Sequence, residues 1–107
     1  MSEKVWAATQ IGARQIELRE YPMPKISADD GLLKMEIAGI CGSDIGGYQE
    51  FEGAPRIRGH ENVGFLAKIG AQAAQRWGVK EGDRVVVEQY LPCGNCRWCR
   101  IGEYRFC

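Results

Sequence analysis

This sequence lacks an excess of charge of either sign, because fourteen Lys and Arg residues balance fourteen Asp and Glu residues. Proteins that bind nucleic acids or anionic membranes depend on surplus Lys and Arg, so the balance argues against both partners. No apolar run approaches the length of a membrane span, and the opening segment MSEKVWAAT has no apolar region of the kind found in signal peptides. We therefore predict a cytoplasmic protein whose thiols stay reduced.

Histidine is nearly absent too, and the cysteines are unevenly placed. His60 is the only histidine, and four of the five cysteines fall in the segment CGNCRWCRIGEYRFC at residues 93–107. An odd number of cysteines in a reducing compartment disfavours a disulfide framework. The spacing C-x2-C-x2-C-x7-C is instead typical of four thiolates around Zn²⁺. The predicted ligands are Cys93, Cys96, Cys99 and Cys107.

A zinc ion with four protein ligands has no position left for water or substrate, so this site would be structural. We assign it to a lobe at residues 91–107. Three arginines, Arg97, Arg100 and Arg105, lie among the cysteines. They would either stabilise the negative charge of the zinc–thiolate centre or form a solvated loop face. Any catalytic chemistry must then lie elsewhere in the chain.

Alternating apolar residues predict a chain made mainly of short strands. The predicted strands are residues 3–9, 15–21, 31–38, 62–70 and 84–90. Turn-prone segments, IGAR and KEGD among them, separate the strands. Helices are expected only in a short stretch after Cys41 and in QAAQRW at residues 72–77. This pattern predicts one domain over residues 1–107, built as a small β-barrel or sandwich.

Two further stretches combine unusual residues: GICGSDIGGY at residues 39–48 and RIRGHENVGFLAKIGAQA at residues 56–73. A lone cysteine is most often a small buried apolar residue, and a lone histidine is most often structural. Here, however, Cys41 and His60 are flanked by glycines that allow close approach of the backbone. Each also has an acidic companion, Asp44 or Glu61. These two residues are therefore candidate ligands.

The segment GHENVGFLAKIGAQA resembles the zinc signature of the medium-chain, zinc-dependent alcohol dehydrogenases, with Gly64, Gly70 and Ala73 at the expected intervals after Gly-His-Glu. CGSD at residues 41–44 resembles the first zinc-ligand loop of that family, and KEGDRVVV resembles the strand that enters its lobe. The cysteine spacing matches the family's structural-zinc lobe. The resemblance extends from about Val5 to Cys107, with four motifs in the family's order.

The resemblance implies a GroES-like, partly open β-barrel that forms the substrate domain of these enzymes. Cys41 and His60 would bind a catalytic zinc, and Glu61 would lie behind the metal or bind it in one of its states. Ser43 would accept the proton of the alcohol, and Asp44 would accept the free ring N–H of His60. The implied reaction is reversible oxidation of an alcohol to a carbonyl, with hydride transfer to NAD or NADP.

The chain also departs from the family pattern. Relatives with a Cys-Gly-Ser-Asp loop often have a histidine where this chain has Gly46, so the outer part of the proton path must differ. A third protein ligand for the catalytic zinc and a Gly-rich phosphate loop between a strand and a helix are both missing. We therefore expect an N-terminal fragment without its Rossmann cofactor domain, inactive by itself.

Two other interpretations are open. A stand-alone structural zinc module would need the cysteine lobe but no enzymatic activity. A zinc ribbon on nucleic acid is disfavoured by the balanced charge. If the chain belongs to a dehydrogenase, we expect a homo-oligomeric enzyme acting on a small alcohol, with a lean towards polyols, secondary alcohols or threonine. Arg58 and Tyr48 are candidates to face that substrate.

Overall fold

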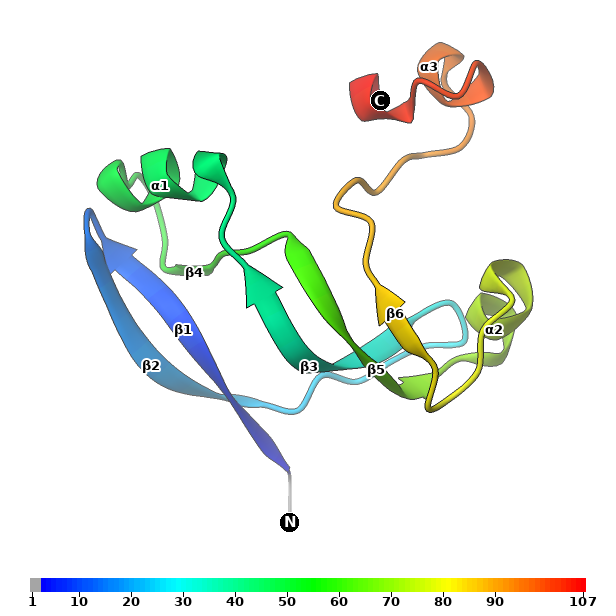
Figure 1. The fold of residues 1–107 in the computed structure, drawn as a ribbon, viewed down its shortest axis with the longest axis horizontal. Coiled ribbons are helices and arrows are strands. Elements are labelled where there is room, and N and C mark those ends of the chain that lie inside the picture. Colours follow the sequence, from blue (N-terminus) through cyan, green and yellow to red (C-terminus); the bar gives the residue numbers. More distant parts are fainter. Residues whose placement is uncertain (1–2) are drawn as a thin grey trace.

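The computed structural model describes residues 3–107 and consists mainly of strands with a few short helices (Figure 1). The strands are β1 (Lys4–Gly12), β2 (Gln15–Pro22), β3 (Gly31–Gly39), β4 (Arg56–Ile57), β5 (Glu61–Ile69) and β6 (Arg84–Val86). The helices are α1 (Gly42–Gln49), α2 (Ala71–Trp77), α3 (Arg97–Arg100) and the 3₁₀ turn η1 (Tyr104–Phe106). The described strands form two antiparallel three-stranded sheets, in the orders β2-β1-β4 and β3-β5-β6.

The first sheet is built on the hairpin of β1 and β2, which pair from Lys4 opposite Pro22 to Gln10 opposite Ile16. Its turn contains Arg14 in the left-handed region, with φ of 57°. The Arg14 N–H donates to the carbonyl of Tyr48 at 2.7 Å, and the Tyr48 hydroxyl donates back to the Arg14 carbonyl at 3.1 Å. The tip of the hairpin is thereby attached to the last turn of α1.

The second sheet pairs β3 with β5, and its close packing explains one glycine of the sequence signature. Gly64 lies opposite Met35, between two irregularities in the register. A Cβ at Gly64 would lie 2.2 Å from the carbonyl oxygen of Lys34, a separation that real Cβ atoms essentially never show. Only glycine fits this point of the sheet without movement of the backbone.

Helix α2 depends on a second close approach of the same kind. A Cβ at Gly70 would lie 2.3 Å from the carbonyl oxygens of Ser27 and Ala28. The Ala28 carbonyl accepts from the N–H groups of Gln72 and Ala73, both at 3.0 Å, so main-chain oxygen satisfies donors that a helix start leaves without partners. Ala73 is completely buried at this contact. The signature residues therefore join α2 to the turn at residues 27–30.

Burial within β5 does not follow the apolar alternation of its sequence. Phe65 is 41% exposed, and its neighbour Leu66 is the buried residue, at 7%. The Leu66 side chain lies on the same side as Trp77, since both would contact a Cβ at Gly31. The strand predicted over residues 84–90 is shorter than expected and ends at Val86, although the Val87 N–H still donates to the Asn62 carbonyl of β5 at 3.2 Å.

The molecule is open, and its buried core is small. Its radius of gyration is 15.9 Å, whereas a compact domain of this length would have one of about 13 Å. Large apolar side chains are exposed on several strands and connections: Trp6 67%, Leu18 70%, Val86 79%, Ile40 82% and Leu91 96%. The predicted fold class, mainly β with short helices and a partly open barrel, is confirmed in the form of two sheets that do not close over the described residues.

The cysteine-rich lobe stands apart from both sheets, at the end of the extended segment that follows β6 (Figure 1). Tyr104 in the lobe donates to the Glu88 carboxylate at 2.9 Å, and its ring meets that of Tyr90 edge-on with centroids 6.3 Å apart. These contacts tie the lobe to its own connecting segment.

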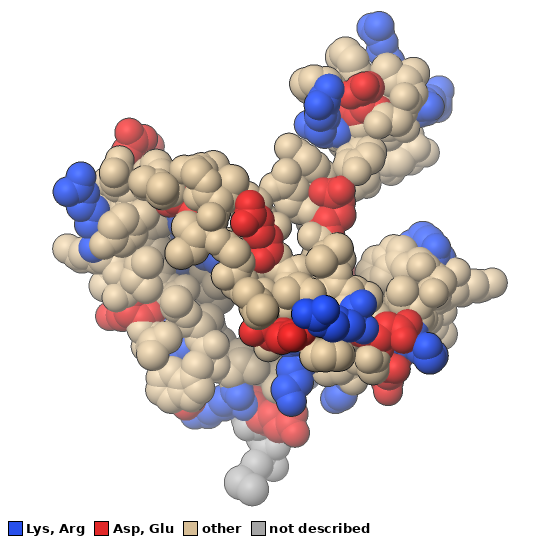
Figure 2. Space-filling view, viewed as in Figure 1, with Lys and Arg blue, Asp and Glu red and all other residues tan. Residues whose placement is uncertain are grey.

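The charged residues agree with the balanced composition. Figure 2 shows Lys and Arg interspersed with Asp and Glu over the visible face, with no large area of one sign. Over residues 3–107, every helix is too short or too polar to cross a bilayer.

Candidate metal centres

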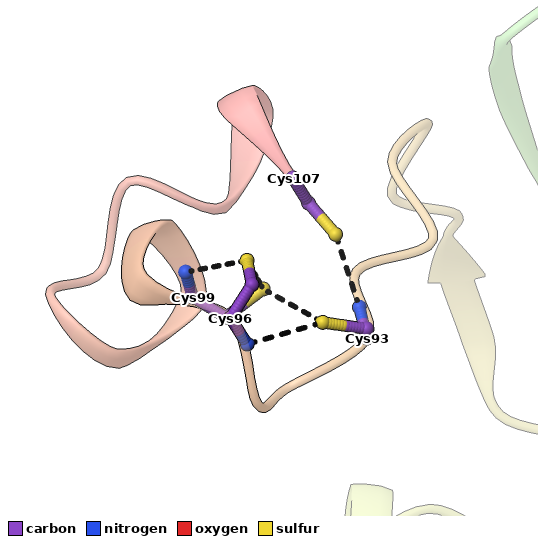
Figure 3. A group of neighbouring side chains, drawn as sticks. All are labelled: Cys93, Cys96, Cys99 and Cys107. Carbon is purple, nitrogen blue, oxygen red and sulfur yellow. Dashed lines mark hydrogen bonds between the residues drawn. The ribbon is translucent and has the colours of Figure 1, made fainter.

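The four lobe cysteines converge on one point, with all four sulfur atoms within 4.8 Å of one another (Figure 3). The Sγ of Cys99 lies 3.5 Å from that of Cys96 and 3.9 Å from that of Cys93. These separations are far beyond the disulfide bond length of about 2.05 Å. With Zn–S bonds of about 2.3 Å, the edges of a tetrahedron of sulfurs measure about 3.8 Å. The cluster therefore fits a zinc ion.

Backbone donors around these sulfurs favour thiolates. The N–H groups of Asn95 and Cys96 donate to Cys93 Sγ at 3.4 and 3.2 Å, and the N–H of Cys93 donates to Cys107 Sγ at 3.4 Å. The Asn95 and Cys96 donors lower the pKa of Cys93 to about 6. Desolvation by burial, by contrast, raises the pKa of Cys99 to about 11. Full deprotonation of the cluster thus requires a cation at its centre.

Two of the three lobe arginines lie against aromatic rings, and Arg105 also pairs with Glu103 at 3.1 Å. The Arg97 guanidinium lies 5.2 Å from the centre of the Trp98 ring, and that of Arg105 lies 4.8 Å from the Phe106 ring. The two rings are themselves 5.3 Å apart. These contacts favour the solvated-face interpretation of the arginines over direct stabilisation of the thiolates.

A second cluster joins Cys41, His60 and Glu61, whose candidate ligand atoms also lie within 4.8 Å of one another. Cys41 immediately precedes α1, and Glu61 begins β5. Gly39 pairs with Glu61 across the sheet, and a Cβ there would lie 2.5 Å from the Glu61 carboxylate. Gly59, with φ of 122°, sets the turn that presents His60. Glycines at both positions therefore let the three ligands meet.

Asp44 connects the two sides of this cluster. It accepts a hydrogen bond from the Cys41 N–H at 2.8 Å, which caps the start of α1. Its other carboxylate oxygen lies 3.8 Å from His60 Nδ1, beyond hydrogen-bond length. The structure thus places Asp44 beside the imidazole, as the resemblance implied, but too far away for the expected hydrogen bond.

The protonation of Cys41 and His60 is linked. The pKa of the Cys41 thiol is lowered by hydrogen bonds from the side chain and the backbone of Ser43 and from the side chain of His60. The Cys41 side chain in turn is the main cause that raises the pKa of His60. The charged forms of the two residues therefore stabilise each other. A thiolate is the form of cysteine that binds metal.

Arg58 and Tyr48, the two candidates to face substrate, line a cavity of about 350 Å³ beside Asp44. Its walls are mostly apolar and come from β1, β2, β3, α1 and the segment before His60. Cys41 and His60 are not among its lining residues, but their sequence neighbours Ile40 and Gly59 are, so the cavity adjoins the second cluster. A Cβ at Gly46 would meet no atom within 4 Å, so the position where relatives have a histidine is open space.

One residue near this site was missed by the sequence interpretation. Gln10 is only 2% exposed and lies among the walls of the same cavity. A single glutamine within a strand gives no signal in the pattern of the sequence. Its environment depends on contacts with residues nearly forty and fifty positions further along the chain.

The alcohol dehydrogenase GroES-like domain family matches residues 27–107. This chain belongs to that family. The matched segment holds both clusters, together with the glycines that allow their close packing.

Full-length relatives point the same way. The chain is 46% identical over 96 residues to a probable alcohol dehydrogenase of Mycobacterium tuberculosis, covering 88% of this chain and 26% of that protein. It is 37% identical over 117 residues to an erythritol/L-threitol dehydrogenase of Mycolicibacterium smegmatis, covering 98% and 32%. The chain therefore spans about a third or less of the length of these relatives.

Solved structures confirm the fold. An alcohol dehydrogenase of Escherichia coli CFT073, crystallised with NADH, matches with a TM-score of 0.83 and 32% identity. The match covers 100% of this chain and 31% of that one.

Proposed function

We propose that this chain is the catalytic, substrate-binding domain of a zinc-dependent oxidoreductase that interconverts an alcohol and a carbonyl with NAD or NADP. The observation that supports this most is the presence of two different cysteine-containing clusters. One offers four sulfurs and leaves no free position, whereas Cys41, His60 and Glu61 offer three donors. Fewer protein ligands are typical of catalytic zinc sites.

The residues of the second cluster fit zinc by their chemistry. Thiolate, imidazole and carboxylate are all zinc ligands in proteins, and a lowered pKa of Cys41 favours the thiolate. Because His60 Nδ1 faces Asp44, its other ring nitrogen is the one free for a metal. A zinc ion bound here would supply Lewis-acid polarisation of the alcohol oxygen.

A side chain of this domain would accept the proton that the alcohol releases on oxidation. Ser43 follows Cys41 by two residues, and its hydroxyl interacts with that thiol, so it would lie beside the oxygen of an alcohol bound at the metal. We assign to it the acceptance of the alcohol proton and the release of its own hydroxyl proton towards solvent, and bound NAD or NADP would supply the hydride acceptor. Gly46 offers no side chain to continue the path, so a water molecule or the cofactor ribose takes that place.

The rest of the enzyme would come from a longer polypeptide. Relatives are about three times as long as this chain, and we assign NAD or NADP binding, and a further zinc ligand, to the additional part. A small polyol is our preferred substrate class, in keeping with the name of the M. smegmatis relative. We further propose a cytoplasmic homo-oligomer without nucleic-acid or membrane partners.

A stand-alone structural zinc module is the second candidate, because the four-cysteine lobe is complete within this chain. The two functions differ in what they require of Cys41 and Ser43. A structural module needs neither residue for its metal, whereas the oxidoreductase needs both.

The test uses the full-length polypeptide that contains this chain, with its zinc content and its NAD(P)-dependent alcohol oxidation measured together. Cys41→Ala and His60→Ala should abolish activity and release the second zinc. Ser43→Ala should lower kcat by about 10²- to 10⁴-fold while zinc stays bound, because it removes a proton acceptor and not a ligand. Cys41→Ala protein with both zinc ions and its full rate would contradict the proposal and favour the structural module.

A further inference from the structure

Gln10 is a buried polar side chain at which three separate segments meet. It lies in β1 and is 2% exposed. Its amide nitrogen donates to the carbonyls of Gly12, Gly47 and Tyr48 at 3.2, 2.9 and 3.2 Å. Its amide oxygen accepts from the Nε–H of Arg58. Both ends of the amide are therefore occupied, as a buried amide requires.

Two of the three carbonyls that Gln10 binds, those of Gly47 and Tyr48, belong to the last turn of α1. Helices leave their final carbonyls without intrahelical partners, and here the Gln10 amide and the Arg14 N–H supply the missing donors. The same helix begins directly after Cys41 and contains Ser43 and Asp44. An anchor at its last turn therefore sets the placement of the residues at its start.

Arg58 extends this anchor to the other side of the second cluster. It lies two residues before His60, and its guanidinium packs directly on Gly47, where a Cβ would lie 2.3 Å from Nη1. Gly47 thus makes room for Arg58, while Gln10 fixes the guanidinium through its Nε–H.

We propose that Gln10 and Arg58 are positioning residues that hold Cys41 and His60 at the separation needed for metal binding. Cys41 follows β3, and His60 precedes β5, so the two ligands reach the site from different segments. The Gln10–Arg58 pair connects α1, the helix that follows Cys41, to the segment that leads to His60. The inference depends on the proposed metal site but adds residues that are not ligands. Loss of such supporting contacts typically weakens metal binding by about 10- to 100-fold.

The experiment is a Co²⁺ titration of the reduced, metal-free full-length polypeptide that contains this chain, followed by the absorption bands of cobalt–thiolate bonds. Each chain is compared with its own Cys41→Ser version, so that the difference isolates the second cluster from the lobe. The test variants are Arg58→Lys, Gln10→Leu and Gly47→Ala. Lysine keeps the charge of Arg58 but loses the planar group with its fixed donors.

The matched controls are Arg76→Lys and Gln75→Leu. Arg76 also joins distant segments, through Asp29 at 2.9 Å, but on the side of α2. Gln75 is an exposed glutamine on that helix. We expect each test variant to weaken Co²⁺ binding at the second cluster at least about tenfold, with binding at the lobe and in both controls unchanged. The double variant Gln10→Leu with Arg58→Lys should lose less Co²⁺ affinity than the product of the two separate fold-losses, because both changes break the same network.

Different failures have different meanings. If the unaltered full-length polypeptide shows no Cys41-dependent cobalt band, the proposed metal site is wrong and this inference falls with it. If the band is present but the test variants bind Co²⁺ as tightly as the controls do, only the positioning role is wrong. An equal loss at both metal centres, or in Arg76→Lys as well, would assign Gln10 and Arg58 to general stability. Should Gln10→Leu fail to fold, the exposed Arg58 still decides the question through Arg58→Lys.

Discussion

Single donor atoms decide what each cysteine can do. Cys93 accepts from two backbone N–H groups, which lower its pKa to about 6. The pKa of Cys99 is raised to about 11 by burial. A zinc ion in the lobe must therefore displace a proton from Cys99 at neutral pH. Because protons compete with the metal for the sulfurs, zinc affinity of the lobe falls as the pH is lowered.

The first prediction at this scale concerns zinc content. Protein purified under reducing conditions should contain one tightly bound zinc per chain, held by the lobe, because four thiolates form a complete ligand set. Cys96→Ser should release this zinc and unfold the lobe, which has little core of its own. Elemental analysis measures the zinc content, circular dichroism measures the unfolding, and Cys41→Ser serves as the control that keeps the lobe zinc. Reduced protein free of zinc would contradict the assignment.

At the scale of elements, two glycines determine how helix α2 and the second sheet are assembled. Both belong to the signature that indicated the family, and both lie against a backbone carbonyl. Their structural role is close packing of the main chain. It is separate from the role of the neighbouring His60 in the second cluster.

We therefore expect Gly64→Ala and Gly70→Ala each to lower the free energy of unfolding by about 1–3 kcal/mol, because the added methyl group displaces backbone. Gly46→Ala is the matched control. Its Cβ would enter open space within α1, so it should raise stability by about 0.5–1 kcal/mol. Urea unfolding followed by circular dichroism measures all three. If Gly70→Ala were as stable as Gly46→Ala, the contact with residues 27–28 would be wrong.

At the scale of the whole molecule, the most prominent feature is apolar surface that no other segment of residues 3–107 covers. Trp6, Leu18 and Val86 are each at least two-thirds exposed, and the radius of gyration of 15.9 Å exceeds that of a compact domain. Such patches usually mark surfaces that pack against other protein. The length of the relatives is consistent with further chain that would pack there.

The isolated 107-residue chain should therefore self-associate as its concentration rises. Sedimentation velocity over a range from micromolar to millimolar should show growing species, and urea at low concentration should reduce them, since it weakens apolar association. The full-length polypeptide provides the comparison. A clean monomer of the isolated chain at millimolar concentration would show that the exposed face is not an association surface.

Much of this protein could be predicted from its sequence, because the deciding features are local. Metal ligands at short spacing, such as Cys93 and Cys96, must lie close together whatever the rest of the chain does. Alternation and turn residues placed most strands and both longer helices. The residues Gly-His-Glu and Cys-Gly-Ser-Asp indicated a second cluster of ligands, and the structure brings Cys41, His60 and Glu61 together.

Only the tertiary structure decided the features that depend on residues far apart in the sequence. Alternation cannot tell which face of β5 is covered, and the structure shows that Leu66, at 7% exposed, lies on the covered face, whereas Phe65 is 41% exposed. The paired part of β6 ends at Val86, opposite Val63 of β5. The contact of Gln10 with Arg58 spans 48 positions, and no local pattern reports it. Ligand spacing and turn residues act over a few positions and can be recognised in the sequence. Burial and strand register depend on which distant segments pack together, so they are set only by the tertiary structure.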